Sequence, residues 1–231
     1  MPVAIITGAS RGLGLALTAG LAEAGWRLVV DARGAGELAA AVARFDPDRV
    51  VAVPGDVTDG AHRNALIAAA DRLGGADLLV NNAGILGPSP QPPLADYPLG
   101  ALREVYEVNV VAPLALIQLA LPGLRARRGA IVNVTSDAAV EGYPGWGGYG
   151  SAKAAIEQAS RVLAAEEPAV RVWWADPGDL RTRMHQEAFP GADISDRPLP
   201  GTVVPALLRL LADEPPSGRV RLADLLTGAG R

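Results

Sequence analysis

Short, continuous apolar runs alternate with longer helical stretches along this chain, and this alternation limits the possible fold more than any other feature. The first run, Val3–Ile6, lies almost at the N-terminus, later runs cover residues 27–30, 50–53, 77–80, 130–134 and 170–174, and a further short strand is expected near residues 219–222. Apolar runs of four or five residues are typical of strands buried on both faces, and strands separated by helices form right-handed βαβ units. The sequence therefore predicts one α/β domain over residues 1–231, a doubly wound Rossmann-type fold whose central parallel sheet is flanked by helices.

A glycine-rich segment, Thr7–Gly14, follows the first run and opens a helix. Glycines permit close backbone approach, and free N–H groups at a helix N-terminus favour a diphosphate. In a doubly wound sheet, residues 81–84 after the fourth strand face this loop across a crevice. Asp56, after the third strand, either accepts from an adenine amino group or caps the next helix. The candidate cofactor contacts of this region are Gly8, Ser10, Arg11, Gly12, Leu13, Gly14, Asp56, Val57, Asn82, Ala83 and Gly84.

The residues after the second strand indicate which dinucleotide is bound. That strand, Arg27–Val30, ends in Asp31, Ala32 and Arg33. A carboxylate there suits the free 2′-hydroxyl of NAD, whereas an arginine suits the 2′-phosphate of NADP. Arg11 in the glycine loop adds a second cation, so the charges favour NADP(H). NAD(H) stays an alternative because Asp31 also lies near the expected ribose.

A tyrosine and the single lysine of the chain stand four residues apart, at Tyr149 and Lys153. The chain has 21 lysines and arginines in total, of which only Lys153 is a lysine. On a helix the two side chains share a face, and an ammonium beside a phenol favours the phenolate needed for acid/base catalysis. Ser136, at the end of the fifth strand, is placed to hold a carbonyl oxygen next to that phenol.

Asn109 lies inside a predicted helix over residues 99–121. Asparagine is a mediocre helix former, so its presence there needs a reason. From the residues alone we expect its amide to make a hydrogen bond to a neighbouring helix; the alternative is that it binds a backbone carbonyl or a water in a local distortion.

Composition and charge exclude several classes of function. A net charge of −4 without a basic face argues against nucleic acid, and the lack of cysteine excludes disulfides and thiolate chemistry. Two histidines make a metal site unexpected. The N-terminus lacks a charged segment followed by a hydrophobic signal core, and prolines interrupt the apolar stretch of residues 110–124. We therefore expect a cytoplasmic protein with no metal and no membrane partner.

Together, these segments resemble the short-chain dehydrogenase/reductase family, in its compact Thr-Gly-x-x-x-Gly-x-Gly subgroup, from Val3 to about residue 222. The resemblance implies that Tyr149 donates or accepts the proton, and that Lys153 lowers its pKa and holds the nicotinamide ribose. Ser136 would bind the substrate oxygen, and Asn109 would support a water relay to Lys153. The segment that would hold the nicotinamide carboxamide comprises Pro177, Gly178, Leu180 and Thr182.

The same resemblance implies an oxidoreductase that moves hydride between the nicotinamide and a small carbonyl compound or secondary alcohol, as a ketone or aldehyde reductase or an alcohol dehydrogenase. It places Ala32 where the NAD-type aspartate stands and Arg33 on the NADP-type arginine. It also implies a homodimer or homotetramer through helices 99–121 and 149–167. Asp176 and Asp179 depart from the family pattern, and either alter the substrate or face solvent.

Two further points remain at the level of the sequence. Residues 183–200 mix Gly, Pro, Asp and Phe, which favours a mobile substrate lid. The alternative to an enzyme is a non-catalytic, NAD(P)-sensing regulatory protein on the same fold, because a fold alone does not define a function. The presence of Ser136, Tyr149 and Lys153 together argues against that alternative, since a sensor needs no proton relay.

Overall fold

A single parallel sheet of seven strands forms the centre of the molecule in the computed structural model, which describes residues 1–227. The strand order is β3-β2-β1-β4-β5-β6-β7, and each neighbouring pair is parallel. The strands are β1 (Val3–Ile6), β2 (Arg27–Ala32), β3 (Val50–Pro54), β4 (Leu78–Asn81), β5 (Ala130–Val134), β6 (Arg171–Asp176) and β7 (Gly218–Arg221). The order reverses between β1 and β4, so the predicted doubly wound fold is confirmed.

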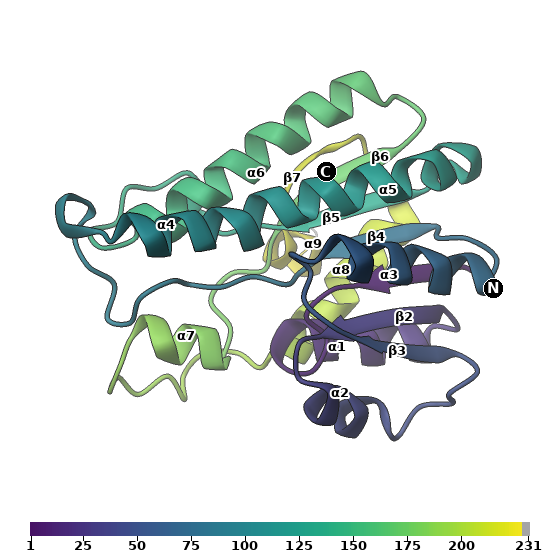
Figure 1. Cartoon of the computed structure of the whole chain (residues 1–231), viewed down its shortest axis with the longest axis horizontal. Helices are drawn as coiled ribbons and strands as arrows, with labels where there is room; N and C mark the ends of the chain where they lie inside the picture. Colours follow the sequence, from purple (N-terminus) through teal and green to yellow (C-terminus); the bar gives the residue numbers. More distant parts are fainter. Residues whose placement is uncertain (228–231) are drawn as a thin grey trace.

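Helices cover both faces of this sheet (Figure 1). One face carries α1 (Gly12–Glu23), α2 (Ala35–Val42), α8 (Val204–Asp213) and α9 (Leu222–Thr227). The other carries α3 (Gly60–Arg72), α5 (Ala112–Arg127) and α6 (Gly147–Glu166). The shorter elements are α4 (Leu99–Tyr106), α7 (Arg183–Ala188) and the turns η1 (Leu94–Asp96), η2 (Glu107–Val111), η3 (Asp137–Ala139) and η4 (Pro200–Val203). In Figure 1, α7 lies away from the sheet, beneath the start of α4.

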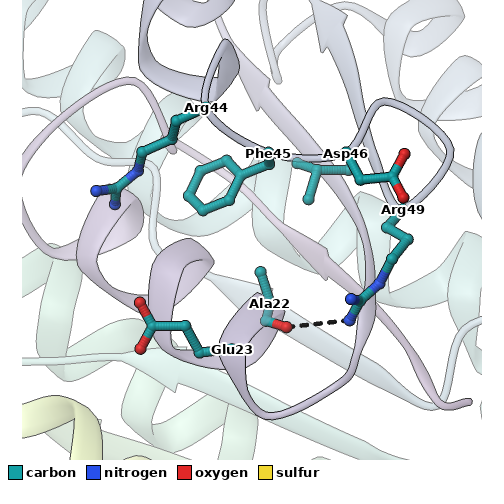
Figure 2. A pocket seen from close by; sticks show the side chains of 7 residues that line it. Ala22, Glu23, Arg44, Phe45, Asp46 and Arg49 are labelled. Atoms are coloured by element: carbon teal, nitrogen blue, oxygen red, sulfur yellow. Dashed lines mark hydrogen bonds between the residues drawn. The ribbon is translucent and has the colours of Figure 1, made fainter.

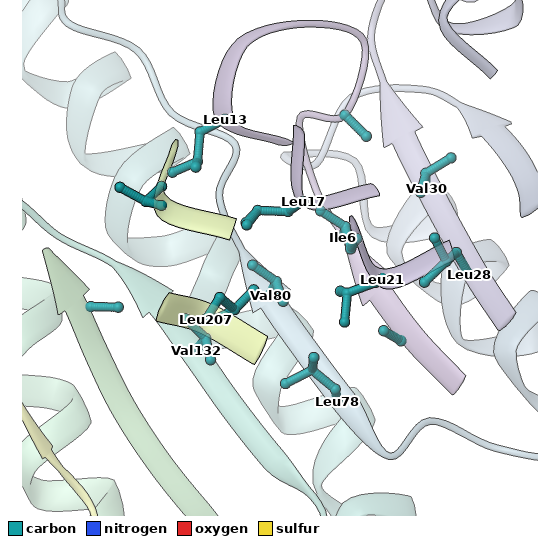
Figure 3. Packing of buried hydrophobic residues seen from close by; sticks show 14 of the residues in the cluster. Ile6, Leu13, Leu17, Leu21, Leu28, Val30, Leu78, Val80, Val132 and Leu207 are labelled. Atoms are coloured by element: carbon teal, nitrogen blue, oxygen red, sulfur yellow. The ribbon is translucent and has the colours of Figure 1, made fainter. Parts of the chain in front are cut away.

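The core consists of two apolar layers, one on each side of the sheet. Alternate residues of a strand point to opposite faces, so Ile6, Val30 and Val80 pack with α1 and α8, while Ile5 and Val29 pack under α3 and α5. Figure 3 shows the first layer, where leucines of α1 and α8 meet the central strands. Because both faces of a central strand such as β1 are buried, its sequence is continuously apolar rather than alternating, whereas the edge strand β7 is only partly buried and carries two arginines.

The helix predicted over residues 99–121 is longer than expected and is interrupted. It runs from Leu99 to Arg127, and η2 forms a π-helical turn around Asn109. By length and composition alone this helix is able to cross a membrane, a test that buried helices of water-soluble proteins also pass. In this structure its inner side, which includes Leu116, Ile117, Ala120 and Leu124, packs against the sheet. The helix is therefore one of the layers that build the fold.

Candidate active site

The glycine loop is held against the end of β4 by hydrogen bonds. Thr7 Oγ1 accepts from the backbone N–H groups of Asn82 and Ala83, each at 3.0 Å. The side-chain amide of Asn82 donates to the carbonyl oxygens of Thr7, at 2.8 Å, and Gly8, at 3.2 Å. Gly8 has φ +70°, and a Cβ there would lie 2.9 Å from Ala83 Cα. These hydrogen bonds fix the loop and the residues after β4 to each other at the point where the strand order reverses. Asn82 has a structural role in this arrangement.

Asp31 has a different role from the one considered in the sequence. Its carboxylate is 1% exposed, accepts the backbone N–H of Gly8 at 2.7 Å, and lies 3.0 Å from His62 Nε2. Both oxygens therefore point inward, so the interpretation that Asp31 reads the ribose is wrong. Sequence reasoning missed His62 because nothing in the chain order links a residue of α3 to the end of β2.

Two arginines and two carboxylates lie near the expected adenosine end. Arg33 follows β2 and is exposed, while Arg11 pairs with Glu37 at 3.1 Å on the open surface. Burial acts to raise the pKa of Asp56, but hydrogen bonds from Thr58 and the nearby Arg33 charge outweigh it, and the pKa is lowered. The carboxylate accepts from the Thr58 N–H and hydroxyl, at 2.9 and 2.8 Å.

The alternative interpretation of Asp56, as the cap of the next helix, is wrong. Asp59 caps α3 instead and accepts the N–H of Ala61 at 2.8 Å. Val57, between the two aspartates, is buried. The turn after β3 is therefore ordered by two separate aspartates.

Tyr149 and Lys153 lie beside each other, and Lys153 is anchored to the end of β5, two residues before Ser136. Ser136 follows that strand, and α6 begins at Gly147, so Tyr149 occupies its first turn and Lys153 the next. Tyr149 is 8% and Lys153 5% exposed, and Lys153 Nζ lies 5.4 Å from the centroid of the Tyr149 ring. Lys153 Nζ also donates to the carbonyl oxygen of Val134 at 2.8 Å. A buried ammonium is thus anchored beside a buried phenol.

Burial shifts the pKa of both groups of this pair. Burial raises the pKa of the Tyr149 phenol, and the negative charges of Asp176 and Asp137 raise it further. Burial also lowers the pKa of Lys153 to about 8. The net shift of the Tyr149 pKa is therefore upward, because desolvation disfavours both charged forms, and the predicted lowering by Lys153 stays a prediction.

Asn109 forms a local distortion rather than the expected hydrogen bond to a neighbouring helix. Its side chain is 2% exposed, accepts the N–H of Ile85 at 2.9 Å and donates to the Ile85 carbonyl at 2.8 Å. A π-helical turn supplies the extra residue that lets the amide leave the helix, a feature frequent at functional sites. A Cβ on Gly84 would lie 3.0 Å from Asn109 Oδ1 and 3.8 Å from Lys153 Nζ. Asn109 and Lys153 therefore flank the same stretch of backbone.

The segment after β6 lies against the glycine loop. Gly178 has φ +72° and its N–H donates to Asp176 Oδ1 at 2.9 Å, while Leu180 is buried. Thr182 accepts the N–H of His185 at 3.2 Å and caps α7. A Cβ on Gly12 would lie 3.6 Å from the Thr182 methyl group. The four residues predicted to hold the carboxamide, Pro177 among them, thus form the second wall of the crevice.

A buried ion cluster behind Ser136 was not predicted. Arg219 Nε lies 3.0 Å from Glu157 Oε1, and Arg219 Nη2 lies 3.0 Å from Asp176 Oδ2. The same Nη2 donates to the Ser136 carbonyl at 3.1 Å, and Thr135 donates to Glu157 at 2.8 Å. Asp176 is therefore structural, whereas Asp179 is more than half exposed and faces His185 and Arg197 at 3.8 Å. Of the two unusual aspartates, only Asp179 faces solvent.

Apolar and aromatic side chains surround the Tyr149 ring. Leu86 and Ala138 pack with it, and Met184 and Ala188 of α7 cover the same cluster. Trp146 stands edge-on to Tyr149, with the ring centroids 5.9 Å apart, and lies equally far from Phe189. The first part of the predicted lid thus contacts the site, while its motion stays a prediction.

A hollow lies beside the edge strand β3, away from the carboxyl ends of the strands. It has a volume of about 200 Å³ and lies between the C-terminal end of α1 and the start of β3 (Figure 2). Arg49 Nη2 donates to the carbonyl oxygens of Ala22 and Trp26, at 3.0 and 3.4 Å, and so satisfies the end of α1. Since ligands of open α/β sheets bind at the carboxyl ends of the strands, this hollow is separate from the candidate site.

The crevice has the features that a dinucleotide needs. The N-cap of α1 is Arg11, whose side chain makes no capping hydrogen bond, so the first N–H groups of the helix are offered to an anion. Lys153, buried at the other end, has ammonium hydrogens beyond the one donated to Val134. The residues present therefore fit a nicotinamide dinucleotide. Fold and site together define a dinucleotide-binding α/β protein with a Ser–Tyr–Lys cluster.

Comparison with known proteins places the chain within one family. The family model described as short chain dehydrogenase matches residues 2–193. The 1-deoxy-11-beta-hydroxypentalenate dehydrogenase of Streptomyces arenae is 37% identical, covering 78% of this chain and 68% of that protein. The L-fucose dehydrogenase of Mus musculus is 31% identical, covering 90% and 76%. The chain belongs to the short-chain dehydrogenase family and is an oxidoreductase.

Solved structures support the same assignment. An alcohol dehydrogenase from the archaeon Thermococcus sibiricus, complexed with 5-hydroxy-NADP, matches with a TM-score of 0.85 at 28% identity, covering 96% of this chain and 95% of that one. A short-chain dehydrogenase from Shigella flexneri, complexed with NADP, matches with a TM-score of 0.87 at 26% identity, covering 96% and 97%.

Proposed function

We propose that this oxidoreductase is an NADP(H)-dependent reductase of small ketones or aldehydes, which also oxidises the matching secondary alcohols. The observation that carries the proposal is the burial of Tyr149 and Lys153 side by side, next to Ser136 at the carboxyl end of β5. The relatives named above act as dehydrogenases, and a further relative, from Saccharomyces cerevisiae, is a benzil reductase. These names support small carbonyl or alcohol substrates.

Each residue of the cluster has a chemical task in this proposal. When bound, the nicotinamide supplies the hydride that a carbonyl carbon receives. Tyr149 gives its phenolic proton to the carbonyl oxygen, and Ser136 holds that oxygen. Lys153 binds the cofactor ribose and stabilises the phenolate that remains, while Asn109 fixes the backbone beside Lys153 for a water relay. Leu180 and Thr182 hold the carboxamide.

Tyr149 carries the proton that reduction of a carbonyl group needs. Burial and the charges of Asp176 and Asp137 raise its pKa, which favours the protonated phenol. The protonated phenol donates to a carbonyl oxygen, and the phenolate that remains accepts a proton when the alcohol is oxidised. A panel of ketones and alcohols, followed by nicotinamide absorbance with NADPH and NADP⁺, tests the proposal. Absence of turnover with every member of a broad panel would contradict it.

We propose NADP(H) as the preferred cofactor because Arg33 is exposed next to the buried Ala32, while Asp31 is turned inward. Replacing Arg33 by alanine is expected to weaken NADPH binding about 10-fold, since a hydrogen bond to a charged group contributes roughly 1.5–3 kcal/mol. NADH binding should change little. Calorimetric titration of both cofactors measures the effect, and Arg44→Ala, at the distant hollow of Figure 2, is the control. An equal loss for both cofactors would contradict the assignment.

A homodimer or homotetramer through α5 and α6 is part of the proposal. Val111, the last residue of η2, exposes 48% of its surface, and Leu114 and Leu119 of α5 expose 38 and 37%. Val162 on α6 exposes 44%. Apolar side chains gathered on neighbouring helices favour association. Light scattering should give at least a dimer for the native chain and a monomer for the double variant Val111→Glu and Leu114→Glu. A native monomer at micromolar concentration would contradict this prediction.

A further inference from the structure

The hydroxyl group of Ser136 is already engaged. Ser136 Oγ donates to Asp137 Oδ1 at 2.8 Å and accepts the backbone N–H of Ala138 at 3.2 Å. The other carboxylate oxygen of Asp137 accepts from the Tyr143 hydroxyl at 3.0 Å. Because a serine has one hydroxyl hydrogen, Ser136 cannot donate to a substrate carbonyl while it donates to Asp137.

Asp137 differs from the other carboxylates near the site because no cation neutralises it. Asp176 is paired with Arg219, and Asp179 faces His185 and Arg197. Within residues 1–227, no arginine, lysine or histidine nitrogen lies within the 4.0 Å of an ion pair from Asp137. The charge of Asp137 reaches the second reactive hydroxyl as well, since it helps to raise the pKa of Tyr149. A carboxylate without a cationic partner therefore stands beside Ser136, and its charge reaches the Tyr149 phenol.

The surrounding wall accepts a flat apolar group. The ring centroid of Trp146 lies 5.9 Å from those of Tyr149 and Phe189 and 6.4 Å from that of Tyr143. Tyr143 and Phe189 are both over two-fifths exposed, so their rings still have surface to offer. An aromatic substituent on the reacting carbon would bury this surface.

Resting on the proposed function, we propose that Asp137 selects the substrate: a ketone with a hydroxyl group on the carbon next to the carbonyl is preferred, and a 2-keto acid is rejected. The neighbouring hydroxyl donates to Asp137 in place of Ser136, which releases the Ser136 hydrogen for the carbonyl oxygen. A carboxylate in the same place meets the bare charge of Asp137 and leaves Ser136 engaged. Hydrogen bonds to a charged acceptor are stronger than neutral ones. Asp137 therefore both attracts the hydroxyketone and repels the 2-keto acid.

Three aryl ketones that differ only at that carbon test the proposal: 2-hydroxyacetophenone, acetophenone and phenylglyoxylate. In each reaction the carbonyl carbon gains hydride from NADPH and the oxygen gains the Tyr149 proton, leaving the alcohol and NADP⁺. Asp137→Asn removes the charge but keeps an oxygen that accepts from Ser136. The readout is the change in kcat/KM ratios between the native and variant enzymes, because the intrinsic reactivities of the ketones then cancel.

The hydroxyketone-to-phenylglyoxylate ratio is expected to fall about 30-fold in Asp137→Asn: about 10-fold from the lost hydrogen bond to a charged group, and about 3-fold from the lost like-charge contact, which solvent screens at the exposed Asp137. Glu141→Gln is the matched control, since it removes a charge from the same loop at an exposed residue that does not touch Ser136. Its ratio should stay within about 3-fold of native, the size expected for a screened surface charge.

A binding measurement separates this inference from the proposed function. Tryptophan fluorescence of the enzyme–NADP⁺ complex follows the binding of the same three ketones, which cannot be reduced there. A shift in the binding ratio in Asp137→Asn without turnover of any ketone would remove the proposed function and keep the selection. An unchanged ratio in both turnover and binding, a shift of equal size in Glu141→Gln, or native enzyme that binds none of the three would overturn the inference.

Discussion

Replacing Tyr149 by phenylalanine is expected to lower kcat by about 10²–10⁴-fold, the usual contribution of general acid/base catalysis. The hydroxyl has no hydrogen-bond partner within residues 1–227, so the substitution removes the proton donor without leaving a buried group unpaired. The ring itself, packed between Leu86, Ala138 and Trp146, is retained. Initial rates with NADPH and an accepted ketone measure the effect.

Cofactor binding is the internal control for this prediction. The Kd of NADPH should stay within about 3-fold, since Lys153, Arg33 and the glycine loop are unchanged and the phenol adds at most one neutral hydrogen bond. Tyr106→Phe is the matched variant, because Tyr106, at the end of α4, is not among the side chains packed with Tyr149 and should keep native rates. Turnover of Tyr149→Phe at the native rate would remove the assigned role. Loss of both NADPH binding and rate would point to a structural role instead.

The fold was predictable because short segments of the sequence determine each of its strands and helices. Four or five apolar residues without alternation define a strand buried on both faces, and the β1–β4 neighbourhood follows from the doubly wound order. The interruption at Asn109 was partly predictable, since a polar amide in an apolar helix needs a partner. Which group becomes the partner of Asn109, here the backbone of Ile85, depends on how the chain returns across the top of the sheet.

In the site too, features set by local sequence spacing were predictable, and features set by tertiary contacts were not. Tyr149 and Lys153 were predictable from i, i+4 spacing, and Ser136 from its place after β5. The direction of Asp31 was not, because the two faces of a buried strand cannot be told apart by its sequence, and the inward face holds Gly8 and His62. The upward shift of the Tyr149 pKa was not predictable, because sequence spacing gives the neighbouring ammonium but not the burial or the charges of Asp176 and Asp137. Arg219 lies 83 residues from Ser136 and meets it only through β6–β7 pairing.

Replacing Arg219 by methionine is expected to lower the free energy of unfolding by about 3–5 kcal/mol, the usual effect of removing one partner from a buried ion pair. Glu157 and Asp176 each have side chains 4% exposed, so both carboxylates would lose their cation without gaining water. The midpoint of thermal unfolding should fall by roughly 10 °C for a chain of this length. Calorimetry measures the change. Arg183→Met, which breaks an exposed pair with Glu187, should cost less than about 1 kcal/mol.

A triple variant distinguishes lost charge from lost packing. Adding Glu157→Gln and Asp176→Asn to Arg219→Met removes all three charges, so most of the lost stability should return if uncompensated charge is the cause. Arg219→Lys should recover only part, because an ammonium lacks the planar fork that reaches Glu157, Asp176 and the Ser136 carbonyl together. Since Asp176 already raises the pKa of Tyr149, its uncompensated charge in Arg219→Met should also raise the upper pKa of the pH–rate profile. A methionine variant as stable as the native chain, with an unchanged profile, would show that the cluster neither holds β7 nor tunes the phenol.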